Sequence, residues 1–576
     1  MSLLTALLAL SPATVPVPPP ASQDVLSIFL DRTDTLLKHP KDQGMRRVVD
    51  MLGLRLLELP GEIPDMREIP PGVLPMVYEM LGSAKTLRIL DARETSPMIP
   101  VSFQLSLQPA NPERATEWMN SLEGMMRSAG APLGVRDAEG WVPVEGGPMP
   151  VRLGASQGAL MLEAGDGAAG PMDLAGVELP GGISPHFAMQ MNVGTVLEMV
   201  MPFVQMGNPE AAEVLMEVAS ATGLEEFSMS MACGSDSQKG YMIARLPGWG
   251  AMMRSKGALP VEGITAEDLA LLPANCTMAN IQSVDVHALF DMMLGIAEPY
   301  LAQAGFDRPL ERIEEMVGVH LERDLLDHLG THMGSYLSDS TGGGGLFSTV
   351  MFIEVKDPVK LSEGLERVSA LFNGALAGQV NGYVQMRTIE RDGMACRTLT
   401  FPGLPIPFEP TMVMGKNNLF VGLTPQAAVA AALQEGGSQP SLMTNNDFLG
   451  GFDGNFSNLY GVSYFAPQAF LREGYGMTTL MCSALSNGVR SRMDATRDAG
   501  LVLPTFGELT QGVRATVGTT RLEANGDMVT KVESDPSMMV GLTRAMGYVT
   551  SNPTMLMAIL PVFMANQNRG MVESSF

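Results

Sequence analysis

In two stretches of the chain, the spacing of apolar residues changes from that of a strand to that of a capped helix. Residues 101–107 (VSFQLSL) alternate between apolar and polar positions, the period of a strand, and residues 350–355 (VMFIEV) predict a second strand. Asn111-Pro112 follows the first and Asp357-Pro358 the second, and apolar residues at helical spacing come next. Because an Asx side chain can cap a helix and proline fits its first position, both stretches are predicted to be strand–helix units.

Hairpin patterns also occur in pairs. Each consists of two apolar runs around a short polar turn, and the last contains Asn525-Gly526, a strong turn signal. The four predicted hairpins are residues 149–162, 411–423, 227–246 and 514–533. Strand and short-helix units are predicted at residues 187–200, 278–292 and 459–471.

The order of these elements recurs, which predicts an internal duplication. Residues 24–255 are interpreted as a first α+β half and residues 266–576 as a second, with residues 256–265 connecting them. Hairpins and adjacent strands favour antiparallel sheets with helices packed on one face. We therefore expect an α+β fold in which the helices after Asn111-Pro112 and Asp357-Pro358 occupy equivalent places.

The start of the chain resembles an export signal. Leu3 to Leu10 is an apolar run of signal-peptide length, Ser11-Pro12-Ala13 offers small residues for cleavage, and a proline-rich stretch follows. Residues 1–23 are accordingly interpreted as a signal peptide and proline-rich start, which predicts a periplasmic or extracellular location. No Lys or Arg precedes the apolar run, so a buried N-terminal helix is the alternative. No apolar run elsewhere reaches the roughly 18 residues of a membrane span.

Charge and composition narrow the class of partner. The 576 residues include 62 Asp plus Glu and 37 Lys plus Arg, a formal net charge of −25. Such a charge repels nucleic acid and anionic lipid surfaces, so neither is an expected partner. Methionine is frequent, with 46 residues, and pliable methionine side chains either fill cores or line surfaces for apolar ligands.

Four cysteines lie far apart in the sequence, at Cys233, Cys276, Cys396 and Cys482. In an exported chain they permit two disulfides, whose pairing the sequence does not specify. The alternative is that all four are small buried apolar residues.

One segment invites a metal-binding interpretation. His328 and His332 are four residues apart, and on a helix they would share a face, with His320 and the carboxylates Glu322, Asp324 and Asp327 nearby. Gly330 lies between the two histidines and favours a helix end instead. His328, His332 and Asp324 are thus the candidate ligands, and no metal or cofactor is predicted.

A second apparent motif, Gly154-x-Ser156-x-Gly158, matches a hydrolase nucleophile elbow, which requires a strand-to-helix turn. The residues after it continue as a strand, so a hairpin turn is predicted and no catalytic residue is assigned.

Part of the chain resembles an uncharacterised bacterial family. Leu272-Pro273-Ala274-Asn275, the unit around Asp285 and Leu289, and the stretch from Gly318 to Gly330 are similar to its loosely patterned motifs. The resemblance covers roughly residues 180–470, and it implies a repeated α+β fold and an extracytoplasmic location. It implies no catalytic residues.

These observations favour an exported, non-catalytic binding or structural protein of the cell envelope. We expect it to bind an unknown protein or apolar ligand through a sheet face or a groove between its halves. The alternatives are a metal-dependent hydrolase that uses the His320–His332 segment and a methionine-lined carrier of apolar ligands or clients.

Overall fold

The computed structural model describes most of the chain beyond residue 23. The described ranges are residues 24–62, 72–91, 101–146, 150–165, 177–207, 227–292, 319–342, 345–377, 383–401, 408–435, 440–489 and 498–540, with a few single residues between them. The predicted signal peptide lies outside the described residues. No helix among the described residues is long and apolar enough to cross a membrane.

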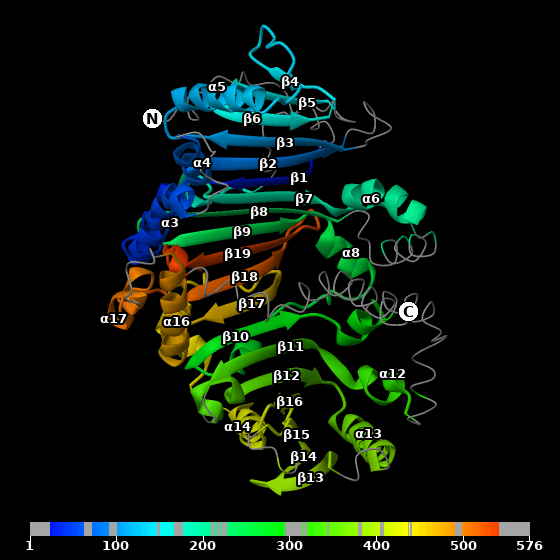
Figure 1. Ribbon diagram of the computed structural model, residues 1–576. Coiled ribbons are helices and arrows are strands. Elements are labelled where there is room, and N and C mark those ends of the chain that lie inside the picture. The colour runs from blue at the N-terminus through cyan, green and yellow to red at the C-terminus, as the bar shows by residue number, and fades with distance from the viewer. Residues whose placement is uncertain are drawn as a thin grey trace.

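A single antiparallel sheet of 19 strands runs the length of the molecule (Figure 1). From one edge to the other its strands are β4 (Val142–Val144), β5 (Val151–Ser156), β6 (Ala159–Ala164), β3 (Val101–Gln108), β2 (Ala84–Asp91), β1 (Asp24–Leu30), β7 (Phe187–Asn192), β8 (Ser228–Ser235), β9 (Gly240–Leu246), β19 (Met528–Ser534), β18 (Thr516–Leu522), β17 (Leu459–Phe465), β10 (Cys276–Ser283), β11 (Leu329–Ser338), β12 (Thr349–Val355), β16 (Asn418–Gly422), β15 (Thr411–Met414), β14 (Met394–Thr400) and β13 (Gln385–Arg391).

The expected mixed α+β class with antiparallel strands is confirmed, but the expectation of a separate sheet in each half is wrong. β9 pairs with β19 along their full lengths, from Gly240 with Ser534 to Leu246 with Met528. Each of these strands ends a hairpin, β8–β9 or β18–β19, so each offers a free edge of backbone N–H and C=O groups. Backbone groups pair whatever the side chains are, so no side-chain pattern could reveal this junction.

The larger helices are α3 (Gln43–Glu62), α4 (Val73–Gly82), α5 (Glu113–Ser128), α6 (Val193–Gly207), α8 (Trp249–Ser255), α13 (Pro358–Ala377), α14 (Pro425–Glu435) and α16 (Pro467–Val489). Shorter ones are α2 (Thr33–Leu36), α9 (Ala266–Leu269), α12 (Leu321–Asp324), α15 (Asn446–Leu449) and α17 (Phe506–Thr510). In Figure 1, α3, α16 and α17 lie at the left of the strands, and α6, α8, α12 and α13 lie at the right.

Helices cover both faces of the sheet, and the prediction that they pack on one face is wrong. In β12, Val350 and Phe352 point to one face, where they form a core with α14. Ile353 and Val355 point to the other face and pack against Leu361 of α13. The reason is that β12 is apolar on both sides, and each side must be covered. We call these the α14 face and the α13 face.

The predicted helices after the two Asx-Pro pairs lie on the same face of the sheet. The Asn111 side chain accepts a hydrogen bond from the Glu113 amide, 3.1 Å, and the Asp357 side chain accepts one from the Lys360 amide, 3.1 Å. α5 packs Trp118 against the side of β5 and β6 that continues the α13 face. The two helices therefore have similar starts and cover the same side.

The four predicted hairpins are all present. The turn between β5 and β6 consists of Gln157 and Gly158, both with positive φ (52° and 76°), as in a two-residue hairpin. Ser156 is therefore the end of a strand and not a nucleophile elbow. None of the four cysteines, all of which are described, forms a disulfide, and Cys276, Cys396 and Cys482 are buried. The interpretation of buried apolar cysteines is confirmed for these three.

Candidate functional site

The segment that contains the candidate metal ligands is not a single helix. α12 ends at Asp324, one short 3₁₀ turn covers Leu326–His328, and β11 begins at Leu329. The prediction of a helix ending at Gly330 is wrong, because Gly330 lies inside β11 with the Glu354 carboxylate packed over it. His328 therefore ends a 3₁₀ turn and His332 lies in a strand, so the two side chains do not share one helical face.

Asp324, the third candidate ligand, has a structural role. Its carboxylate is buried, accepts a hydrogen bond from the His320 amide at 3.1 Å, and pairs with Arg323 at 3.1 Å and Arg367 of α13 at 3.2 Å. Burial opposes ionisation, but these donors outweigh it and hold the pKa of Asp324 below its usual value. Asp324 thus joins the start of α12 to α13.

His332 connects two parts of the second half. Its Nδ1 lies 3.0 Å from Glu354 Oε2 in β12, and its Nε2 lies 3.7 Å from Asp268 Oδ2 in α9. Burial disfavours the charged ring, but the hydrogen bond with Glu354 and the charge of Asp268 prevail, so the pKa of His332 is raised. The hydrogen bond from His332, with one from the Thr331 amide, lowers the pKa of Glu354 to about 2. The group is a charged clamp between α9 and the sheet.

A different histidine lies in the most compact group of potential metal ligands. His287 and Asp291 are four residues apart on the helix that begins at residue 286, which Asp285 caps by accepting the Ala288 amide at 3.0 Å. Leu289, on the opposite side of this helix, is buried in a core, so His287 and Asp291 face outward. Glu322 of α12 completes the group.

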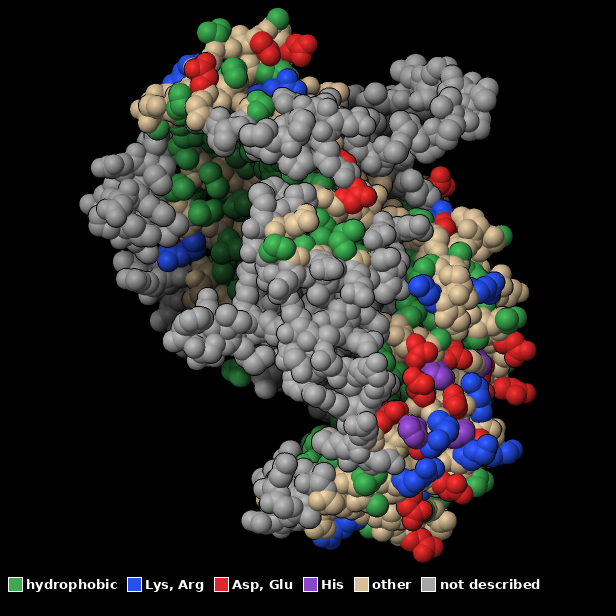
Figure 2. Space-filling model, turned by 90° about the vertical axis from the view of Figure 1, so that its right-hand side faces the viewer, with side chains coloured by type: hydrophobic (Ala, Val, Ile, Leu, Met, Phe, Trp, Pro, Cys, Tyr) green, Lys and Arg blue, Asp and Glu red, His purple; other side chains and the backbone are tan. Residues whose placement is uncertain are grey.

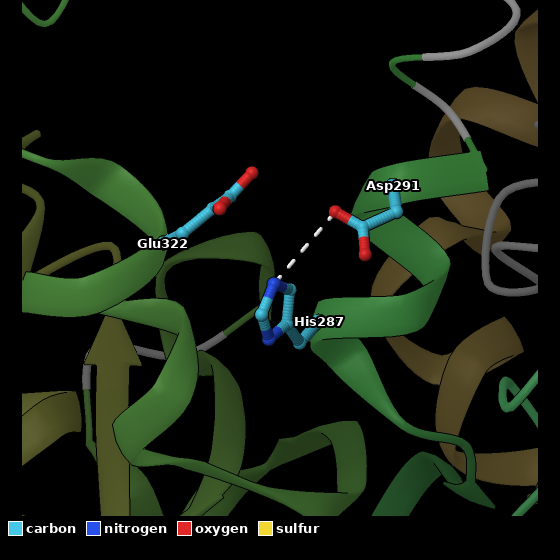
Figure 3. Close-up of side chains that lie close together, drawn as sticks. All are labelled: His287, Asp291 and Glu322. Atoms are coloured by element: carbon cyan, nitrogen blue, oxygen red, sulfur yellow. Dashed lines mark ion pairs between the residues drawn. The ribbon is translucent and has the colours of Figure 1, made fainter.

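Figure 3 shows the three side chains directed toward one another from two separate elements. One donor atom from each of His287, Asp291 and Glu322 lies within 4.8 Å of the others. His287 Nε2 faces Asp291 Oδ1 at 3.7 Å, while its Nδ1 lies 3.2 Å from Asp327 Oδ1. Asp327 thus holds the ring so that Nε2 points into the group.

His287 was not predicted to be a site residue, although a helix was predicted in the stretch that carries it. The signal that could have found it is the spacing of His287 and Asp291, which share one side of a helix. Glu322 and Asp327 belong to the segment that was singled out, but only the tertiary structure brings them to His287.

A polar pocket of about 690 Å³ lies between the two halves of the chain. The first half contributes residues around the start of α3 and the β8–β9 turn, and the second contributes residues around α17 and the ends of β18 and β19. Its ionisable lining residues are His39, Lys41, Arg47, Glu508, Arg514 and Asp535.

The two acidic residues of this pocket are already engaged. Asp535 Oδ2 lies 3.0 Å from Lys41 Nζ, and both side chains are nearly buried. Glu508 accepts hydrogen bonds from the Thr505 hydroxyl, 2.6 Å, and amide, 3.0 Å, in a helix cap that lowers its pKa. Arg47 and Arg514 are exposed, and no acidic side chain of the described residues forms an ion pair with either. Three cationic side chains, those of Lys41, Arg47 and Arg514, thus line the pocket with two carboxylates, and its net charge is positive.

Some of the methionines that could line an apolar binding surface pack into a core instead. Met253 is buried, and Met252, Met292 and Met528 pack against the same cluster around Leu259 and Tyr460.

No protein-family model, curated protein or solved structure matches the chain.

Proposed function

We propose that this chain is an exported binding protein of the cell envelope that holds a small anionic ligand in the pocket between its halves. The observation that carries the proposal is the lining of that pocket, in which Arg47 and Arg514 lie exposed while both acidic groups are occupied. The proposal refines the expectation of a ligand in a groove between the halves, and it replaces an apolar ligand by a charged one.

The halves are proposed to be related by duplication. Outward from the β9–β19 pair, one side has the order β9-β8-β7-β1-β2-β3-β6-β5-β4, and the other has β19-β18-β17-β10-β11-β12-β16-β15-β14. Each strand on one side has a counterpart at the same step on the other, and β13 is an addition at one edge. Two copies of one unit joined edge to edge give this order.

Among the described residues, the two turns at corresponding places in this order differ in what packs on them. At the β18–β19 turn, α8 packs directly on the chain: the Ala251 amide donates to the Gly526 carbonyl at 3.0 Å, and a Cβ on Gly526 would meet Ala251. At the β8–β9 turn, Ser237 and Gln238 instead border the pocket. A duplicated unit that is closed on one side and open on the other has space for a ligand.

The charge of the lining defines the ligand class. A guanidinium group binds carboxylate or phosphate through two parallel hydrogen bonds, and two such groups from different halves can hold a ligand with one or two anionic groups. The chain as a whole carries a charge of −25, so a positive pocket is a local exception to the surrounding field. Export is proposed from the apolar run Leu3–Leu10 and from the resemblance to an extracytoplasmic family.

Native mass spectrometry of the protein purified from its own envelope fraction tests the proposal. We expect a bound acidic small molecule, and titration calorimetry with inorganic phosphate and with citrate should then rank the two anion types. The double variant Arg47→Ala/Arg514→Ala should weaken binding at least tenfold. Arg46→Ala is the matched control, because Arg46 is exposed on the same helix but does not line this pocket.

Three outcomes decide whether the anion binds in this pocket. Loss of binding in the double variant and not in the control supports the pocket as the site. Equal binding by all three proteins shows that the anion binds elsewhere and contradicts the proposal. A bound lipid or peptide with no dependence on Arg47 and Arg514 would instead support an apolar or protein partner.

A further inference from the structure

We infer that His287, Asp291 and Glu322 bind a divalent transition-metal ion of the Zn²⁺ and Mn²⁺ class. This site is separate from the anion pocket, because α12 lies at the opposite end of the strands from α3 and α17 (Figure 1). The inference therefore does not depend on the proposed function.

The donor set determines the class of ion. One imidazole nitrogen and two carboxylate oxygens suit zinc or manganese, whereas magnesium and calcium prefer oxygen ligands alone. Water would complete the coordination, since the side chains of Asp291 and Glu322 are exposed and His287 is partly exposed.

The spacing of the donor atoms is close to what an ion requires. In a tetrahedral zinc site with bonds of about 2.1 Å, two ligand atoms lie about 3.4 Å apart. The donor atoms of His287, Asp291 and Glu322 lie within 4.8 Å of one another, so small side-chain rotations bring them into place. Asp291 and Glu322 come from two elements, which the ion would connect (Figure 3).

The orientation of the ring is the second argument. Asp327 Oδ1 lies 3.2 Å from His287 Nδ1, which favours the tautomer with its proton on Nδ1 and with the Nε2 lone pair toward the group. A carboxylate on the far nitrogen is the usual partner of a metal-binding histidine, because it fixes the ring and increases its basicity. Asp327 is therefore a positioning residue and not a ligand.

The charge balance of the group is the third argument. Asp291, Glu322 and Asp327 surround one imidazole, and no Lys or Arg in the described part of the chain forms an ion pair with any of them. Nearby carboxylates differ: Asp324 pairs with Arg323 and Arg367. Figure 2 shows histidine, acidic and basic side chains gathered on the lower part of this side of the molecule. The His287 group is left with an excess of negative charge that a divalent cation would neutralise.

Titration calorimetry with Zn²⁺ on the full chain, freed of metal by a chelator, tests the inference. We expect one zinc ion to bind with micromolar affinity, and Ca²⁺ to bind much more weakly. His287→Ala and Glu322→Gln should each reduce the zinc affinity at least tenfold, and Asp327→Asn should reduce it less while shifting the Co²⁺ absorption spectrum. His320→Ala and Glu363→Gln are matched controls, since both residues are exposed and lie outside the group.

Thermal unfolding in the chelator shows whether each variant is folded. Unchanged zinc affinity in His287→Ala, or equal affinities for Ca²⁺ and Zn²⁺ in the wild type, would overturn the inference. Loss of zinc binding in His320→Ala but not in His287→Ala would also overturn it and place the ion elsewhere in the segment.

Discussion

The α14 face of the sheet differs between the two halves of the chain. Cross-strand pairs connect this face without a break from Ser106 in β3 to Phe352 in β12. From β17 to β16 in the second half it is apolar: Phe352 packs with Tyr336 and Phe420 at ring-centroid distances of 6.3 and 6.2 Å. Alanine-rich α14 covers it closely, and a Cβ on Gly422 would lie 2.6 Å from the Ala428 nitrogen.

In the first half the same face has an apolar cluster around Ala188, Ala232 and Ile243, and beside it a row of polar side chains. Strand pairing aligns seven of them across adjacent strands: Arg152, Glu163, Gln104, Arg88, Ser27, Gln190 and Ser230. Most are buried, and they bond within the row: Gln104 donates to Glu163 at 2.7 Å, and Arg152 donates to the other oxygen of Glu163 at 2.7 Å. Arg88 forms a buried ion pair with Asp24.

The difference shows that one strand order tolerates two opposite ways of filling a face. An apolar face is stabilised by area removed from water and by close packing, so it needs a covering helix. A polar face is tolerated only while its groups remain bonded to one another, because each unpaired buried group is costly. Mutations should therefore affect the two faces through different mechanisms.

The largest effect is expected from Phe352→Ala in the apolar face. The substitution removes a fully buried ring between Tyr336 and Phe420 and leaves a cavity, which costs roughly 3–5 kcal/mol of unfolding free energy. Urea unfolding followed by circular dichroism measures it. A loss below about 1 kcal/mol would mean that α14 is loosely packed and that the contrast between the faces is overstated.

The polar face should respond strongly to loss of one ion-pair partner. Arg88→Met leaves Asp24 buried without its main counter-charge, at a cost of about 3 kcal/mol. The double variant Asp24→Leu/Arg88→Met should recover most of that loss, because no uncompensated charge remains. A double-mutant cycle by urea unfolding measures the coupling; additive effects would show that the pair is not the source of the stability.

A smaller effect is expected from Gln104→Leu. It removes one of the donors to the buried carboxylate of Glu163, which should cost about 1–3 kcal/mol although leucine is the more apolar residue. Gln108→Leu on the same strand is the control, since Gln108 is exposed and a surface change of this kind is usually within about 0.5 kcal/mol. If Gln104→Leu is stabilising, the row does not behave as a bonded network.

The smallest effect on stability is expected from the charged clamp of His332, Glu354 and Asp268, at the edge of the apolar face. The pKa of His332 is raised in the folded state. Its contribution to the free energy of unfolding is therefore complete below pH 6.5 and is lost as pH rises through the higher folded-state pKa. The lowered pKa of Glu354 means that its contribution is complete above pH 4.5 and is lost as pH falls toward about 2. The pair therefore contributes most between these limits, by about 1 kcal/mol or less.

Thermal unfolding of wild type and His332→Gln at several pH values measures this. We expect the difference in Tm to be largest near pH 5.5 and to shrink by pH 9, with exposed His320→Gln as the control. A difference that grows toward pH 9 would contradict the charged clamp.

Local pattern predicted much of the fold. Alternation in residues 101–107 and the turn Asn525-Gly526 specified strands and a hairpin, because side-chain period and turn chemistry act over a few residues. The Asx-Pro pairs marked the starts of α5 and α13 for the same reason. In contrast, His328 and His332 were interpreted on a helical spacing, although Gly330 lies in a strand that pairs with β12. Pairing partners distant in sequence overrode the local signal there.

The sequence by itself determined the α+β class, the acidic charge and the recurring order of strand, capped helix and hairpin, since each depends on residues close together in the chain. Only the tertiary structure decided that β9 joins β19 into one sheet, that α14 covers the face opposite α13, and that Glu322 reaches His287. Those contacts join residues far apart in sequence through backbone edges and packed surfaces. Nothing in the neighbouring residues specifies a partner of that kind.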